Sequence, residues 1–201
     1  MELLPFLTGL KEVVVTIAAA TGAFVAYKGL TKWKKELKGR SNHETAKLIL
    51  TSTFNVRKAV HIVRNNWISL DEYPTSQNVS DADKYTHMFK QRWEILDSAI
   101  HELEYAKIQD QALWGKDFEK IFHTLNAAIH ELNYSINSYL EMLSKHRTHD
   151  ELLNDESLKY KYLECKSIIF HVPILDLHCD SYAGRLYKAM KEIEDSVKIY
   201  I

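Results

Sequence analysis

An uncharged apolar run near the N-terminus most strongly constrains how this chain can fold. Residues Val13 to Tyr27 read VVVTIAAATGAFVAY, and the lysine-rich stretch KGLTKWKKELKGR follows directly. Fifteen uncharged residues form about 22 Å of helix, whereas the hydrocarbon core of a bilayer is about 30 Å thick. Leu30 and Trp33 can lengthen the span at the interface while Lys28 snorkels toward the headgroups. The run therefore predicts a membrane anchor of minimal length.

An apolar run at this position can also belong to a cleaved signal peptide or to a buried helix. Small residues such as Ala18 and Ala20 could form the cleavage site of a signal peptide, and a soluble protein could bury the run as a core helix. However, Glu2 precedes the run and most of the nearby positive charge follows it. The positive-inside rule then predicts a single-pass protein of the inner membrane, with the N-terminus outside and residues 28 to 201 in the cytoplasm.

Charge is distributed unevenly along the chain. The formal net charge is −1, but residues 28 to 40 carry five lysines and one arginine against one glutamate. Residues 41 to 201 therefore sum to −5, and an acidic body of this kind is a poor general binder of nucleic acid, so no DNA partner is expected. The basic stretch instead predicts contact with anionic lipid headgroups, through Lys32, Lys34, Lys35 and Lys38.

The composition of the anchor favours contact with other helices. Ala18, Gly22 and Ala26 recur at every fourth position, so they share one helix face. Small residues on one face let helix backbones approach closely in lipid, where packing drives association. A homo-oligomer is therefore expected, with these oligomerisation or pore residues: Thr16, Ala18, Gly22, Ala26 and Lys28. The alternative is a weakly hydrophobic tether in which the alanines have no role.

Helical periodicity continues after the anchor and predicts two domains, residues 1 to 40 and residues 41 to 201. Gly39 is a natural helix end, and Ser41 with Glu44 forms a capping box that predicts a new helix. The later helices are expected over residues 41–65, 80–113, 118–143, 151–166 and 182–200. The predicted fold class is all-α: a single N-terminal transmembrane helix followed by a cytoplasmic bundle of about five helices, two of which form a long antiparallel hairpin.

No sequence motif for a cofactor or a metal stands out. The chain lacks a P-loop, a dinucleotide fingerprint and a nucleophile elbow, so no cofactor is expected. Histidines and carboxylates beside the apolar stripes are better explained as surface ion pairs: Asp97 with His101, and Glu119 with His123, with His130 nearby. A looser cluster matches no usual zinc spacing: Cys165, His171, His178 and Cys179. No metal site is predicted.

Arg57 and His61 are the candidate residues for chemistry in the helical body. They lie one helical turn apart, with Arg64 one turn further on, and could hold a phosphate and support acid–base chemistry on RNA. A solvated helix face explains the same spacing. A single histidine in each chain is rarely sufficient for acid–base catalysis. A second chain would therefore have to supply another histidine across a dimer interface.

Two stretches carry a resemblance to a known group of proteins. With the short anchor, KWKKELKG and ETAKLILTSTFNVRKAVHIVRN resemble the small membrane accessory proteins of type VI-B CRISPR systems. The resemblance implies a HEPN-like helical domain that oligomerises into a membrane pore and accompanies an RNA-targeting effector. HEPN nucleases carry Arg, four to six residues and then His, whereas three residues separate Arg57 from His61. The resemblance therefore does not imply nuclease activity.

Three functions remain open at this point. The first is an oligomeric pore-forming or membrane-perturbing accessory in antiviral defence. The second is a membrane-tethered domain that binds or cleaves RNA with Arg57 and His61. The third is a single-pass scaffold whose helical body docks a partner protein.

Overall fold

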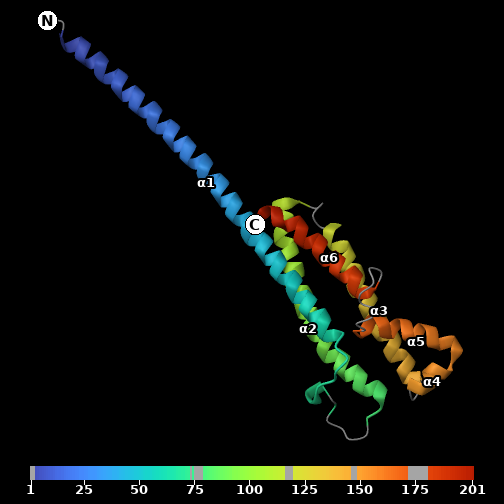
Figure 1. The fold of residues 1–201 in the computed structure, drawn as a ribbon. Helices are drawn as coiled ribbons and strands as arrows, with labels where there is room; N and C mark the ends of the chain where they lie inside the picture. The colour runs from blue at the N-terminus through green and yellow to red at the C-terminus, as the bar shows by residue number, and fades with distance from the viewer. Residues whose placement is uncertain (1–2, 73, 75–78, 116–119, 146–148, 172–180) are drawn as a thin grey trace. The chain divides into compact units, whose positions relative to one another are not determined.

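The fold is built from helices alone throughout the described part of the chain. The computed structural model describes residues 3–72, 74, 79–115, 120–145, 149–171 and 181–201 (Figure 1). These residues contain no strand. In chain order the elements are α1 (Leu3–Val63), η1 (Leu70–Glu72), α2 (Asp81–Trp114), α3 (His123–Lys145), α4 (His149–Asn154), α5 (Glu156–Ile169), α6 (Tyr182–Val197) and η3 (Lys198–Tyr200). The predicted all-α fold class is confirmed.

The chain divides into two compact units, Met1–Glu44 and Thr45–Ile201. Helix α1 runs through this boundary without interruption, so the helix end predicted at Gly39 and the start predicted at Ser41 are wrong. A single glycine costs a helix only about 1 kcal/mol relative to alanine, and the lysines, glutamates and leucines around Gly39 are good helix formers. Glu44 pairs with Arg40 at 3.7 Å, one turn away on the same helix.

In the N-terminal unit the apolar side chains of α1 are exposed. Between Val14 and Leu37, the large hydrophobic side chains are exposed by 49% to 70%. The most apolar window of α1 has a mean hydropathy of 1.4, and none of it is buried. One helix of the described chain is thus long and apolar enough to cross a membrane. Because the run is not buried, the alternative of a soluble core helix is not supported.

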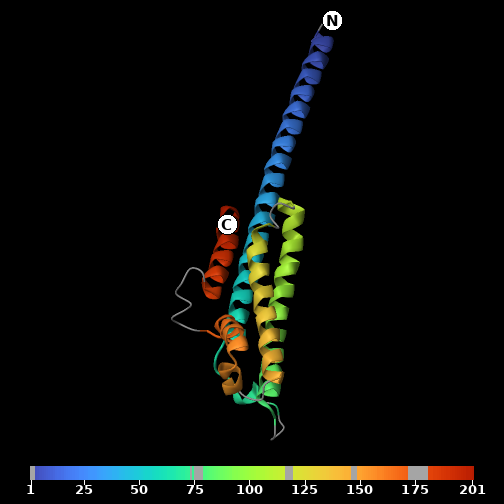
Figure 2. The same cartoon turned by 90° about the vertical axis from the view of Figure 1, so that its right-hand side faces the viewer.

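The helical unit is a bundle around one apolar core. Its long members are the part of α1 from Thr45 onward, α2, α3 and α6, while α4 and α5 pack beside α3 (Figures 1 and 2). Helices α2 and α3 run in opposite directions side by side, which confirms the predicted hairpin (Figure 2). Each long helix buries one stripe in the core, including Ile49, Val56, Val60, Met88, Leu96, Leu125, Leu132, Tyr139, Leu186 and Ile193.

Capping groups set several helix ends. The Ser80 hydroxyl accepts a hydrogen bond from the Asp83 amide at 3.2 Å and begins α2, and Gly115, with φ 86°, ends it. Both ends of α2 lie within one residue of the helix expected over residues 80–113. The helix predicted over residues 151–166 is instead divided into α4 and α5, because Asp155 leaves the helical conformation and accepts from the Ser157 amide at 2.9 Å. Short polar side chains of this kind compete with helix continuation.

We expect Ser80→Ala to lower the free energy of unfolding by about 1 kcal/mol, since the Asp83 amide loses its side-chain acceptor. Chemical denaturation of the detergent-solubilised protein, followed by circular dichroism, measures this change. Ser80→Thr keeps the hydroxyl, which accepts from the Asp83 amide and donates to the Asp83 carboxylate at 2.6 Å, and should remain close to wild type. Equal stability of the alanine variant and the wild type would show that the cap contributes nothing.

Candidate functional site

A groove of about 480 Å³ lies between α1 and α6 in the helical unit. Its basic lining residues come from α1 and from the end of α5: Arg57, Lys58, His61, Arg64 and His171. Its apolar and aromatic lining comes from both helices: Phe54, Val60, Ala183, Leu186, Tyr187 and Met190. Residues four apart share a helix face, and the structure accordingly brings Arg57 and His61 to the same groove.

The polar groups at the groove make few contacts with one another. The Arg57 guanidinium lies over the Tyr187 ring, 5.9 Å from its centroid. The imidazole rings of His61 and His171 meet edge to face with centroids 6.0 Å apart. Among the described residues, no carboxylate lies within ion-pair distance of Arg57, Lys58 or His61. Within the described residues, the groove therefore combines two cations that have no ion pair, Arg57 and Lys58, with aromatic surface.

Arg64 lines the groove, but its guanidinium donates hydrogen bonds to backbone carbonyls at the end of α5. Its side chain is only 4% exposed, and its Nε donates to the carbonyl of Ile168 at 2.7 Å. Its Nη2 donates to the carbonyls of Phe170 and Ser167 at 3.2 and 3.3 Å. The last carbonyls of a helix lack intrahelical donors, and a cation there also complements the helix dipole. Arg64 thus caps α5 and does not join Arg57 and His61 as a free cation.

Backbone contacts from the same region position His171. Its amide donates to the carbonyl of Arg64 at 3.0 Å, and its carbonyl accepts from Nδ2 of Asn66 at 2.9 Å. His171 therefore reaches the groove because the end of α5 is tied to the end of α1. The sequence places His171 near Cys165 and His178 and offers no signal for this long-range pairing.

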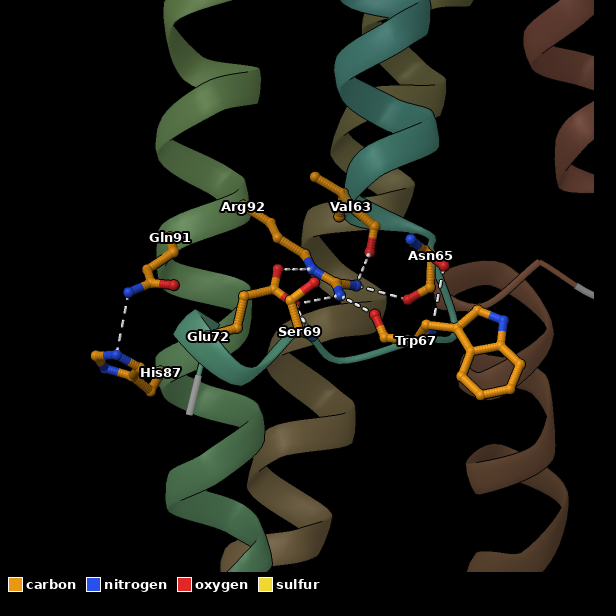
Figure 3. Close-up of polar contacts among 8 residues, drawn as sticks. All are labelled: Val63, Asn65, Trp67, Ser69, Glu72, His87, Gln91 and Arg92. Atoms are coloured by element: carbon orange, nitrogen blue, oxygen red, sulfur yellow. Dashed lines mark hydrogen bonds and ion pairs between the residues drawn. The ribbon is translucent and has the colours of Figure 1, made fainter. Parts of the chain in front are cut away.

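A second buried arginine organises the connection between α1 and α2. Figure 3 shows Arg92 of α2 pointing toward Glu72 and toward carbonyls of the connection. Its Nε and Nη2 donate to Oε1 and Oε2 of Glu72 at 2.6 and 2.8 Å. Its Nη1 and Nη2 also donate to the carbonyls of Asn65 and Trp67 at 2.6 and 2.5 Å. A sequence signal exists, because Arg92 interrupts the apolar stripe of α2 between Phe89 and Leu96.

The Arg92 hydrogen bonds hold the pKa of the Glu72 carboxyl below its ordinary value, against the opposing effect of burial. A carboxyl whose pKa is lower in the folded state than in the unfolded state stabilises the fold at pH values above the unfolded pKa. For Glu72 that reference value is 4.5. The stabilisation is lost as the pH falls from there through the lowered pKa of the folded state.

The histidine pairs considered as metal ligands lie mostly at the surface. His101 and Asp97 are exposed and 3.4 Å apart, as expected of a surface ion pair. Within the described residues, no group of three or more His, Cys, Asp or Glu side chains could hold a metal ion. Cys165 is buried, and burial raises the pKa of its thiol. Glu119, His178 and Cys179 lie outside the described residues.

The predicted assembly residues lie on the exposed part of α1. Ala18, Gly22 and Ala26 are all exposed, and a Cβ added at Gly22 would meet no atom within 4 Å. The Lys28 ammonium lies over the Phe24 ring, 4.9 Å from its centroid. Thr16 and the lysines predicted at the membrane surface are exposed as well: Lys32, Lys34, Lys35 and Lys38. Contact between copies of this helix remains a prediction.

Comparison with protein-family models, with curated proteins and with solved structures finds no match to this chain. The function is therefore argued from the chain's own residues.

Proposed function

We propose that this protein is a single-pass membrane protein whose N-terminal helix assembles with copies of itself and forms a pore or otherwise perturbs the bilayer. The N-terminus lies outside the inner membrane, and the helical domain lies in the cytoplasm, where it controls assembly. One observation carries the proposal, namely the exposed apolar surface of α1 in the N-terminal unit.

Lipid is the environment that suits this surface. The apolar side chains from Val14 to Val25 have no protein neighbours that bury them, and exposure of such a patch to water is unfavourable. Backbone groups within a helix are satisfied internally, as a bilayer requires. The Thr21 hydroxyl also donates to the carbonyl of Ile17 at 2.8 Å, so its hydrogen is already bonded within the helix when the helix lies in lipid. The basic stretch that follows favours a cytoplasmic position for the rest of the chain.

Assembly is supported by the open face of small residues. Ala18, Gly22 and Ala26 leave a shallow track on which a second helix backbone can approach closely. Lys28 and Thr16 tolerate a water-filled lumen better than they tolerate lipid. Lys28 lies about 120° around the helix from Gly22, so it can border a lumen while the small-residue face contacts a neighbouring helix.

The resemblance to type VI-B accessory proteins extends this proposal to antiviral defence. An RNA-targeting effector, or the RNA that it processes, would then be the signal received by the helical domain. Membrane assembly itself does not depend on that context and can be tested with the purified chain.

We expect Gly22→Leu to convert a detergent-solubilised oligomer into monomers, because an isobutyl group on the small-residue face prevents close approach of the backbones. Light scattering during size-exclusion chromatography measures the particle mass. Ala20→Leu adds the same group on nearly the opposite side of the helix and should leave the oligomer intact. A wild-type protein that is monomeric, or a Gly22→Leu oligomer of unchanged mass, would contradict the proposal.

A further inference from the structure

We propose that the outward face of α2 in one copy of this chain packs against the groove between α1 and α6 of the next copy. The contact rests on the proposed function, because it requires copies that assemble in one membrane. It names the surfaces through which their helical domains meet. The face of α2, called the acidic face below, comprises exposed residues of one side of that helix: Glu94, Ile95, Ser98, Glu102 and Tyr105.

The acidic face carries two carboxylates without a cationic partner. Glu94, Ser98 and Glu102 recur at every fourth position, so they share one side of α2. Among the described residues, no lysine or arginine lies within ion-pair distance of either glutamate, and the Glu102 carboxylate accepts from Nδ2 of Asn55 at 2.9 Å. Beside α1 this face borders a hollow of about 540 Å³. Lys58 lines both this hollow and the groove, and is therefore assigned to neither surface.

The groove between α1 and α6 presents the opposite charge. Arg57 and His61 line it, and Lys191 of α6 lines a smaller hollow that also includes Arg57. Within the described part of the chain, none of these three side chains has an ion pair. Glu194 of the smaller hollow is paired with Lys198 at 3.5 Å. Opposite charges on two surfaces steer the surfaces together and fix their register.

Both surfaces also expose large apolar side chains. Ile95 and Tyr105 of the acidic face are 49% and 61% exposed, and Phe54 and Tyr187 at the groove are 51% and 56% exposed. Charge pairs at a surface contribute little by themselves, so a stable contact also needs apolar area that leaves water. Aromatic side chains are enriched in protein interfaces for this reason. The two surfaces therefore match in apolar character as well as in charge.

The orientation of the copies predicts which residues meet. Copies with one topology in one bilayer are related by rotation about the membrane normal, so their α1 helices point the same way. Glu102 is bonded to Asn55 of its own chain, and Arg57 lies half a turn further along α1. Glu102 of one copy is thus expected opposite Arg57 of the next, and Ser98 opposite Tyr187, whose ring lies against Arg57. A contact between two different surfaces repeats from copy to copy and can close into a ring.

A disulfide cross-link between copies tests the contact in membranes that contain the full-length protein. Copies with Ser98→Cys and copies with Tyr187→Cys, each with its own tag, are produced together and oxidised with copper phenanthroline. A mixed dimer should form, whereas either variant alone should give no more dimer than wild type. Tyr134→Cys replaces another exposed tyrosine, located on α3 outside both surfaces, and should not cross-link to Ser98→Cys.

An exchange of charges tests the role of the carboxylates. Lys191→Glu in the Tyr187→Cys copy should lower the yield of mixed dimer by about tenfold, because Glu102 then meets a like charge. Glu102→Lys in the Ser98→Cys copy should restore the yield. Lys159→Glu makes the same change on α5, away from both surfaces, and should leave the yield unchanged. A yield that Lys191→Glu does not lower overturns the proposal.

Particle mass distinguishes this contact from assembly of the membrane helices. An oligomeric wild type whose cysteine variants give no mixed dimer overturns the contact and leaves the assembly of the anchors standing. A monomeric wild type contradicts the assembly and the contact together. A mixed dimer that persists when both copies carry Gly22→Leu supports the contact, since the helical domains then bind each other without the small-residue face.

Discussion

We expect Arg92→Leu to lower the free energy of unfolding by about 3–5 kcal/mol, the range found when one partner of a buried ion pair is removed. The side chain is 2% exposed and holds both carboxylate oxygens of Glu72. Leucine would leave that carboxylate without its charged partner and the carbonyls of Asn65 and Trp67 without their donor. An unpaired buried polar group costs its full desolvation energy, which explains the size of the effect.

Urea denaturation of the full-length protein in detergent, followed by circular dichroism, measures this loss. Arg57→Leu is the matched control because it removes an arginine that is exposed and has no ion pair within the described part of the chain, and it should change stability by less than about 0.5 kcal/mol. Glu72→Gln should destabilise the fold and remove the part of the acid sensitivity that arises from the lowered pKa of Glu72. An Arg92→Leu protein as stable as the wild type would show that the ion pair does not support the α1–α2 connection.

We expect Ala20→Arg to remove the protein from the membrane. Arginine at the centre of a spanning helix costs about 2.5–3.5 kcal/mol on the insertion scale, and the run from Val13 to Tyr27 is short and rich in alanine. Each 1.4 kcal/mol is a factor of ten, so the ratio of inserted to uninserted protein should fall by about a hundredfold. The marginal length of the anchor leaves little apolar surface to offset that cost.

Alkaline extraction of isolated membranes measures the inserted fraction. Ala20→Leu increases the hydrophobicity of the same position and should remain in the membrane pellet, as wild type should. Lys47→Ala lies in the helical unit and should have no effect on extraction. Ala20 shares a helix face with Thr16, which the proposal places at the lumen, so Ala19→Arg is measured as a second variant. If both arginine variants stay in the pellet as fully as wild type, the run does not span the bilayer.

Features that depend on neighbouring residues could be read from the sequence. The bounds of α2 agree with the range expected, residues 80–113, because a cap such as Ser80 acts on amides within the same turn and a positive φ favours glycine at Gly115. The apolar stripes of α2 and α3 and the connection between them predict the antiparallel hairpin for the same local reason. The position of Arg57 and His61 on one face of α1 also follows from helical spacing alone.

Two local sequence signals were too weak to predict correctly where a helix begins or ends. Gly39 and Ser41 resemble a helix end, yet strong helix formers on both sides carry α1 through them. Asp155 lies inside a plausible helical stretch, yet its capping bond to Ser157 divides that stretch into α4 and α5. A glycine or an N-cap changes helix stability by only about 1 kcal/mol, so neither residue alone decides where the helix ends.

By itself the sequence determined that this chain is helical, that its first helix is apolar enough to enter a membrane, and where small residues and lysines fall on that helix. These properties follow from the order of residues along one helix. Only the tertiary structure decided that His171 joins Arg57 and His61, that Arg64 is occupied by the end of α5, and that Arg92 is bound to Glu72. The physical reason is that the donor or acceptor that satisfies each of these groups comes from a distant segment, which packing of the bundle alone brings within reach.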